Sequence, residues 1–260
     1  MILARASEIP QAISRRTYST LDGMRGVAAV MVVGHHARDI FGPFFAGGWL
    51  AVDLFFCLSG FVIAHAYGSK LNDGTLRFTS FMWIRIVRLY PLFLLSIVFS
   101  VALMMASAIG GNGTMDRATS IPPSIFFLPT PFAGTLYPLN LPAWSLFMEL
   151  FINAVAASCW QWLTNRNLTI VVFLSGFLLI ILMIKLGSVG GGGSWNDLHL
   201  GVVRVTFSFF AGVGIFRIRN FKIPIVSPAI LVATLIVSLT LGPEIDVFGQ
   251  LGDVDKFTHP

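Results

Sequence analysis

Long apolar runs alternate with short polar segments along this chain. The runs cover residues 21–38, 47–67, 79–108, 142–163, 168–186, 200–216 and 223–242. Each run is near or above the ~20 residues that an α-helix needs to cross a bilayer. The pattern therefore predicts an all-α fold, a polytopic transmembrane helix bundle with about seven spans.

Composition supports the same class of protein. Of the 260 residues, 55% are hydrophobic and only 11% are charged, and the mean hydropathy is +0.81. Such a chain is too apolar for an ordinary soluble domain. The formal charge of +5 is better explained by Lys and Arg in cytoplasmic loops than by nucleic-acid binding. We therefore expect the lipid bilayer as a partner, and no nucleic acid.

The basic residues also orient the spans. If the N-terminus is cytoplasmic, the inner segments hold Arg5, Arg15, Arg16, Lys70, Arg77, Arg166, Arg217, Arg219 and Lys222, and the outer ones hold Arg38, Arg117, Lys185 and Lys256. This excess of inner cations predicts a multi-pass protein of the cell (inner or plasma) membrane with its N-terminus inside. Residues 1–20 are then a cytoplasmic segment, 21–242 the transmembrane domain and 243–260 an external tail or loop.

Two connections stand out. Residues 109–141 are rich in Gly and Pro, so they cannot form a regular helix, and the apolar stretch 125–128 within them predicts a surface-lying or re-entrant segment. The glycine run 190–193 predicts a flexible outer loop.

Arg25 and His36 are the first candidates for chemistry. Eleven residues at 100° each return to within roughly 20° of the starting direction, so a helix places both on one stripe, about 16 Å apart along its axis. His35 would point about 80° away. Ionisable side chains are costly in lipid unless they face a protein interior. The pair is therefore a functional candidate, and the alternative is an interfacial Arg with a structural His.

Arg85 and Arg88 are three residues apart and therefore share one helix face. Two adjacent guanidiniums suit a phosphate or pyrophosphate, because each can bind oxygens bidentately. At a cytoplasmic helix end they can equally bind anionic lipid headgroups.

Further polar residues lie in apolar surroundings. Asp53 needs a cationic partner there and is either a structural counter-ion or a functional group. Ser145 and Glu149 share one helix face, and Glu149 can serve in proton transfer, hydrogen-bond an acceptor hydroxyl or pair with an Arg. Arg204 is another buried cation in need of an anion. Ser59 and Gly60 predict a site of close helix packing.

Taken in order, these segments resemble the acyltransferase 3 family of integral-membrane O-acyltransferases. The resemblance is carried by Leu21-Asp-Gly-Met-Arg-Gly26, His36, Val52-Asp-Leu-Phe-Phe-Cys-Leu-Ser-Gly-Phe61, Arg85-x-x-Arg88-Leu-Tyr-Pro91 and Trp144-Ser-Leu-x-x-Glu149, and it covers about residues 18–220. Arg25 and His36 match the family's Arg-x10-His pair. Arg85 and Arg88 match its Arg-x-x-Arg motif, proposed to hold acyl-CoA, and Ser145 and Glu149 match its Ser-x-x-x-Glu motif.

The resemblance implies transfer of an acyl group, most often acetyl, from acyl-CoA to a carbohydrate or glycolipid hydroxyl. We expect His36, Arg25 and Glu149 to be catalytic and Arg85, Arg88, Ser145 and Asp53 to bind substrate. No metal or bound cofactor is expected, since acyl-CoA is a co-substrate. His36 is either the general base or a transient acyl acceptor. Family members usually have about ten spans, so seven would be a domain incomplete at its C-terminus. The competing interpretation is a secondary transporter.

Overall fold

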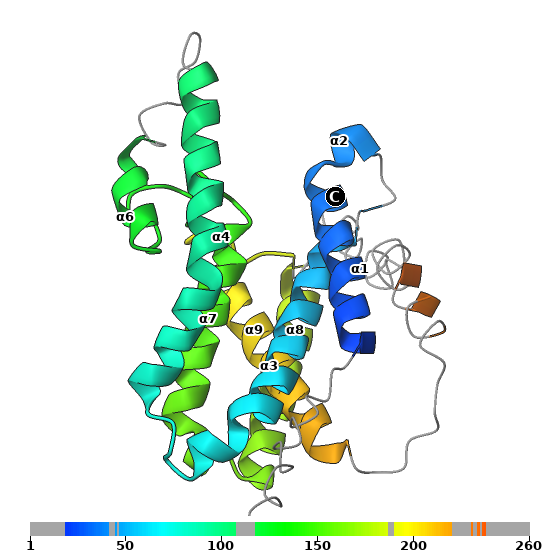
Figure 1. Cartoon of the computed structure of the whole chain (residues 1–260). Coiled ribbons are helices and arrows are strands. Elements are labelled where there is room, and N and C mark those ends of the chain that lie inside the picture. The colour runs from blue at the N-terminus through cyan, green and yellow to red at the C-terminus, as the bar shows by residue number, and fades with distance from the viewer. Residues whose placement is uncertain are drawn as a thin grey trace, which may run out of the picture.

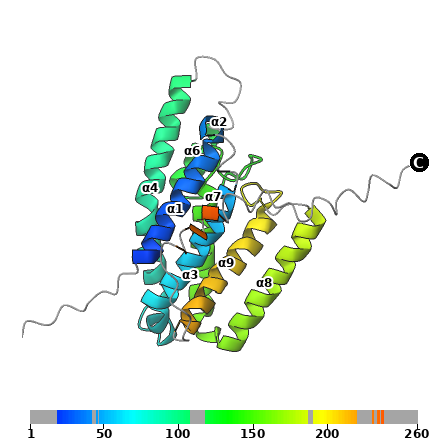
Figure 2. The same cartoon turned by 90° about the vertical axis from the view of Figure 1, so that its right-hand side faces the viewer.

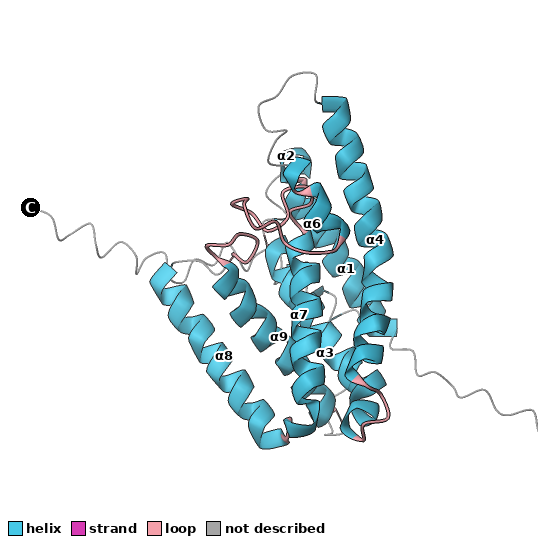
Figure 3. Cartoon of the chain, turned by 90° about the vertical axis from the view of Figure 1, so that its left-hand side faces the viewer, coloured by secondary structure: helices cyan, strands magenta, loops and turns pink. Residues whose placement is uncertain are grey.

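The structure is a computed structural model that describes residues 19–41, 45, 47–107, 118–186, 190–219, 230, 233, 234, 236 and 237. Most of the N-terminal segment 1–20, most of the seventh predicted span (223–242) and the whole tail 243–260 lie outside these residues. Regular structure in the described residues is helical, apart from one isolated β-bridge between Thr135 and Ser194 (Figure 3).

Helices form where the sequence has its apolar runs (Figure 1). They are α1 (Ser19–His36), α2 (Arg38–Phe41), α3 (Gly48–Asn72), α4 (Phe78–Ser107), α6 (Ile121–Ile125), α7 (Ala143–Cys159), the 3-10 helix η2 (Trp160–Trp162), α8 (Asn165–Leu186) and α9 (Leu198–Ile218). Five are long and apolar enough to cross a membrane: α3, α4, α7 with η2, α8 and α9. The chain is thus a polytopic helical bundle. α1 forms as expected, but its polar residues make it less apolar than these five.

α9 occupies the centre of the bundle and packs against α3, α7 and α8. α1 packs on α3, and α4 packs on α7; α1 and α4 lie apart in Figure 1, but in Figure 2 both lie on the side of the bundle away from α8. The main core joins α3, α7 and α9 through buried side chains that include Phe56, Ile63, Met148 and Phe209. α4 and α8 instead expose rows of large apolar side chains, as expected for helices that face lipid.

Small residues allow α3 and α9 to approach closely. A methyl group at Gly60 would overlap the carbonyl oxygen of Phe209, and one at Gly212 would overlap that of Cys57. Glycines at these two positions therefore let the backbones touch, which is the usual way to pack membrane helices. The close packing expected at Ser59 and Gly60 is present.

The connection between α4 and α7 folds back along α4. Tyr90 donates a hydrogen bond from its hydroxyl to the Ile125 carbonyl (2.7 Å), and the rings of Phe93 and Phe127 are 4.1 Å apart. Twelve residues separate Phe78 from Tyr90, about 18 Å of a helix that is about 45 Å long. The segment thus lies beside the middle of α4 rather than beyond its end, which agrees with the re-entrant alternative.

Candidate active site

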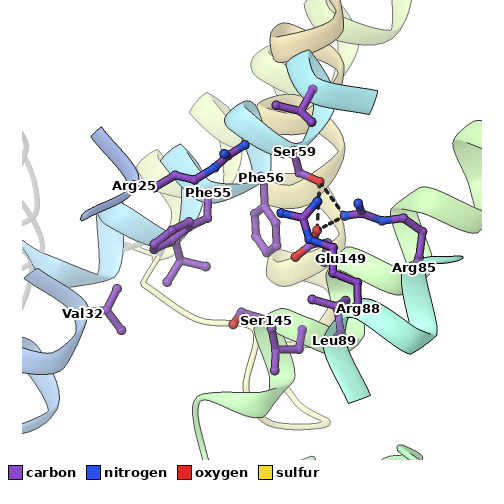
Figure 4. A pocket seen from close by; sticks show the side chains of 13 residues that line it. Arg25, Val32, Phe55, Phe56, Ser59, Arg85, Arg88, Leu89, Ser145 and Glu149 are labelled. Atoms are coloured by element: carbon purple, nitrogen blue, oxygen red, sulfur yellow. Dashed lines mark hydrogen bonds and ion pairs between the residues drawn. The ribbon is translucent and has the colours of Figure 1, made fainter. Parts of the chain in front are cut away.

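A cavity of about 300 Å³ lies between α1, α3, α4 and α7 (Figure 4). Its polar lining is Arg25, Ser59, Arg85, Arg88, Ser145 and Glu149. Five of the seven site residues expected from the sequence are therefore brought together: Arg25, Arg85, Arg88, Ser145 and Glu149. The remaining wall is apolar, with valines, leucines and two phenylalanines. A cavity of this kind can bind a ligand that is anionic at one part and apolar at another.

Arg85, Glu149 and Ser59 form a closed group on the cavity wall. Arg85 donates a hydrogen bond from Nη2 to Glu149 Oε1 (2.5 Å), and Ser59 Oγ donates to the same oxygen (3.0 Å). Arg85 Nη2 also lies 3.4 Å from Ser59 Oγ. The Arg85 side chain is 3% exposed and that of Glu149 is 18% exposed. The acid whose position suggested either proton transfer or pairing with an Arg is thus paired with Arg85.

Arg88 has a different environment from Arg85, although both line the cavity. Arg88 is exposed, and the described residues provide it with no hydrogen bond or ion pair. Figure 4 shows its guanidinium directed toward the cavity beside Glu149. The motif therefore supplies one guanidinium that is already neutralised and one that is available to a ligand.

Arg25 reaches the cavity from the opposite wall, on α1 (Figure 4). It pairs with Asp22 one turn earlier (2.9 Å), where the Asp22 side chain is 66% exposed. An exposed pair within one helix contributes little binding energy, so a ligand can compete for Arg25. Arg25 and Arg88 thus place two cations on facing walls.

His36 lies on the same helix as Arg25, beyond the cavity. Val32, between them on this stripe, lines the cavity, whereas His36 lies one turn further along α1 and is exposed. The His36 ring stands edge-on to that of His35, with centroids 5.5 Å apart. His35 donates from Nδ1 to the Phe45 carbonyl oxygen (3.2 Å). His35 is therefore engaged in a local contact, as expected of a structural histidine.

Asp53 does not line the cavity. Its Oδ2 accepts a hydrogen bond from Arg204 Nη2 (2.8 Å), and its Oδ1 accepts from Arg204 Nε (3.3 Å) and Ser208 Oγ (3.4 Å). Each of the two lone intramembrane charges noted in the sequence is thus the partner of the other. This position favours the counter-ion alternative for Asp53 over direct substrate binding.

Ser59 is the cavity residue that the sequence interpretation assigned only to packing. Its hydroxyl contacts both members of the Arg85–Glu149 pair. The available signal was a hydroxyl placed two turns after Asp53 in an otherwise apolar helix. Among the described residues, no group of three or more His, Cys, Asp or Glu side chains is arranged to hold a metal ion.

Comparison with known proteins places the whole chain in context. The family model described as "Acyltransferase domain" matches residues 18–253. A protein of Rhizobium radiobacter described as "Protein 2 in picA locus" is 41% identical over 176 residues, which cover 62% of this chain and 92% of that protein. No solved structure matches the chain.

Proposed function

The chain belongs to the acyltransferase 3 family and is a membrane acyltransferase, and from this premise we propose that it takes an acyl group from acyl-CoA. The group is most simply acetyl, and the acceptor is a hydroxyl of a cell-surface or exported carbohydrate or glycolipid. The observation that carries this proposal is the cavity, in which Arg25 and Arg88 stand on facing walls and the neutralised Arg85–Glu149 pair lies beside Arg88. No metal or resident cofactor is required.

The donor's phosphates are bound between Arg88 and Arg25. Guanidinium forks match phosphate oxygens in geometry and charge. Arg85 contributes less to the donor because Glu149 already offsets its charge. Its role, with Ser59, is to fix the cavity wall on which Arg88 stands.

The acyl group then lies toward His36. Arg25 and His36 are separated by about 16 Å along α1, so a donor held by its phosphates at Arg25 has to extend along this helix. A sugar hydroxyl is a weak nucleophile at neutral pH. A base that removes its proton during attack on the thioester carbonyl typically contributes about 10²–10⁴-fold in rate. His36 supplies that base, or it accepts the acyl group first and passes it to the hydroxyl.

The direction of transfer follows from the orientation. The bundle end with the α3–α4 and η2–α8 connections carries Lys70, Arg77, Arg166, Arg217 and Arg219, and the other end carries Arg38 and Lys185. The positive-inside rule supports a cytoplasmic N-terminus. Arg25, on the first turns of α1, then meets a cytosolic donor, and His36 lies on the outer side.

Equilibrium binding to the solubilised protein tests the donor assignment. The Arg88→Gln variant loses one charge-assisted phosphate contact, worth about 1.5–3 kcal/mol. Its affinity for acetyl-CoA should therefore be roughly 10–150-fold weaker than that of the unaltered chain. Acetyl-pantetheine, which lacks phosphate, should bind the variant and the unaltered chain equally. The matched control Arg166→Gln, on an exposed arginine at the start of α8, should change neither. Equal losses for both thioesters, or no loss of acetyl-CoA binding, would contradict the assignment.

A further inference from the structure

Arg204 lies outside the cavity, yet it connects the structural elements that form one of its walls. We propose that Arg204 is a positioning residue for acyl transfer: it fixes the start of α7, and so Ser145, against α3. This inference rests on the proposed function, because it takes the cavity as the site of the reaction.

All three nitrogens of the Arg204 guanidinium donate hydrogen bonds. Nε and Nη2 donate to the Asp53 carboxylate, Nη2 also donates to the Trp49 carbonyl (3.1 Å), and Nη1 donates to the Gly191 carbonyl (2.7 Å). The residue is only 2% exposed. These contacts join α9 to α3 and to the loop before α9. A lysine could keep the charge but could not make this set of directed bonds.

The same guanidinium also faces two indole rings. Its Cζ is 5.4 Å from the centroid of Trp49 and 5.6 Å from that of Trp144, within the range of cation–π attraction. Trp49 belongs to α3 and Trp144 to the first turn of α7. No side chain caps the N-terminus of α7, so the packing around Trp144 adds to the backbone hydrogen bonds that hold this turn, such as the one from the Ala143 N–H to the Asn140 carbonyl (2.9 Å).

The outer loop completes the packing around Trp144. A methyl group at Gly192 would come within 2.6 Å of the Trp144 ring, and one at Gly193 within 3.2 Å. Gly192 has a φ of +127°, a backbone conformation that residues other than glycine rarely adopt. The glycine run that the sequence suggested to be a flexible loop is thus packed on this indole.

Trp144 is linked to the cavity in two ways. Ser145 is the next residue, and the rings of Trp144 and Phe56 meet edge to face with centroids 6.5 Å apart. Both Ser145 and Phe56 line the cavity. A shift of the α7 start would therefore move the cavity wall on the Ser145 side, whereas Arg88 belongs to α4.

A charge-neutral pair of substitutions separates positioning from stability. Arg204→Gln with Asp53→Asn removes both charges together, so neither is left buried and unpaired, and the thermal midpoint should fall far less than in either single variant. The transfer rate should still fall, by about 10²-fold if the wall moves by about 1 Å. Acetyl-CoA binding should be unchanged. Recovery of the transfer rate together with stability would show a merely structural role and overturn the proposal.

A second measurement does not depend on activity. With Cys57 and Cys159 replaced by Ala, the alkylation rate of the Ser145→Cys variant measures directly how accessible this part of the cavity wall is. The paired substitution, and Trp144→Leu in a chain that keeps the Arg204–Asp53 pair, should each raise that rate by about tenfold through local opening. Arg217→Gln removes a guanidinium that bonds Leu163 and Asn165 at the other end of α9, so it should leave the rate unchanged.

An unchanged rate in both Trp144→Leu and the paired variant would overturn the positioning role, as would an equal rise in Arg217→Gln. Absence of acyl transfer by the unaltered chain would instead refute the proposed function, and the alkylation rates would still decide what Arg204 positions. If the paired variant does not fold, Trp144→Leu decides alone.

Discussion

The Arg85–Glu149 pair allows a quantitative prediction that separates it from Arg88. Removing one member of a buried ion pair leaves the other charge uncompensated, which typically costs about 3–5 kcal/mol. The Arg85 side chain is 3% exposed and that of Glu149 is 18% exposed, and Arg85 Nε already has no partner among the described residues. Glu149→Gln leaves Arg85, the more buried of the two charges, without a partner. We therefore expect Glu149→Gln to destabilise the protein more than Arg85→Gln does.

The double variant Arg85→Gln/Glu149→Gln leaves no buried charge, so it should cost less than the sum of the single variants by at least about 2 kcal/mol. Arg88→Gln is the matched control, because Arg88 stands one turn along the same helix and is exposed. It should lie within about 0.5 kcal/mol of the unaltered chain. Unfolding of the detergent-solubilised protein measures all four. Additive single effects, or an Arg88→Gln as destabilising as Arg85→Gln, would refute the division of roles.

Further predictions concern packing and topology. Gly60→Ala and Gly212→Ala should each cost about 1–3 kcal/mol of stability or more, because the added methyl group meets backbone atoms. Gly26→Ala, with open space around it, should be neutral or stabilising. Unfolding measurements compare the three variants, and equal effects would contradict the α3–α9 packing. Cysteines introduced by Asp73→Cys and Asn196→Cys should react with an impermeant maleimide from opposite sides of the membrane, Asp73→Cys from inside, and labelling of both from one side would contradict the topology.

The sequence predicts the helices well because a bilayer sets their length and polarity. The apolar run 47–67 becomes α3 (Gly48–Asn72), and 200–216 becomes α9 (Leu198–Ile218). Helix faces are also predictable at short range: Val32, on the stripe predicted from Arg25, lines the same cavity, although His36 at the far end of that stripe does not. Spacing along one helix is a local property, so it needs no knowledge of the neighbouring helices.

Partners between helices could not be predicted in this way. Arg85 and Glu149 are 64 residues apart, and Asp53 and Arg204 are 151 apart. The sequence shows that such charges need partners, but several pairings satisfy that need equally well. The unequal roles of Arg85 and Arg88 depend on which guanidinium meets Glu149. That is decided by how α4 rotates against α7, and the three-residue spacing of the motif contains no information about it.

In the proposed function, His36 stands at the reacting end of acyl transfer from acyl-CoA. The most direct measurement is transfer of label from acetyl-CoA to exported carbohydrate, or release of CoA thiol, in membranes with equal amounts of the unaltered chain, His36→Ala and His35→Ala. From the proposed function we expect His36→Ala to lose about 10²–10⁴-fold in rate and His35→Ala to keep a substantial part of it. No transfer by the unaltered chain, or loss with His35→Ala and activity with His36→Ala, would contradict it.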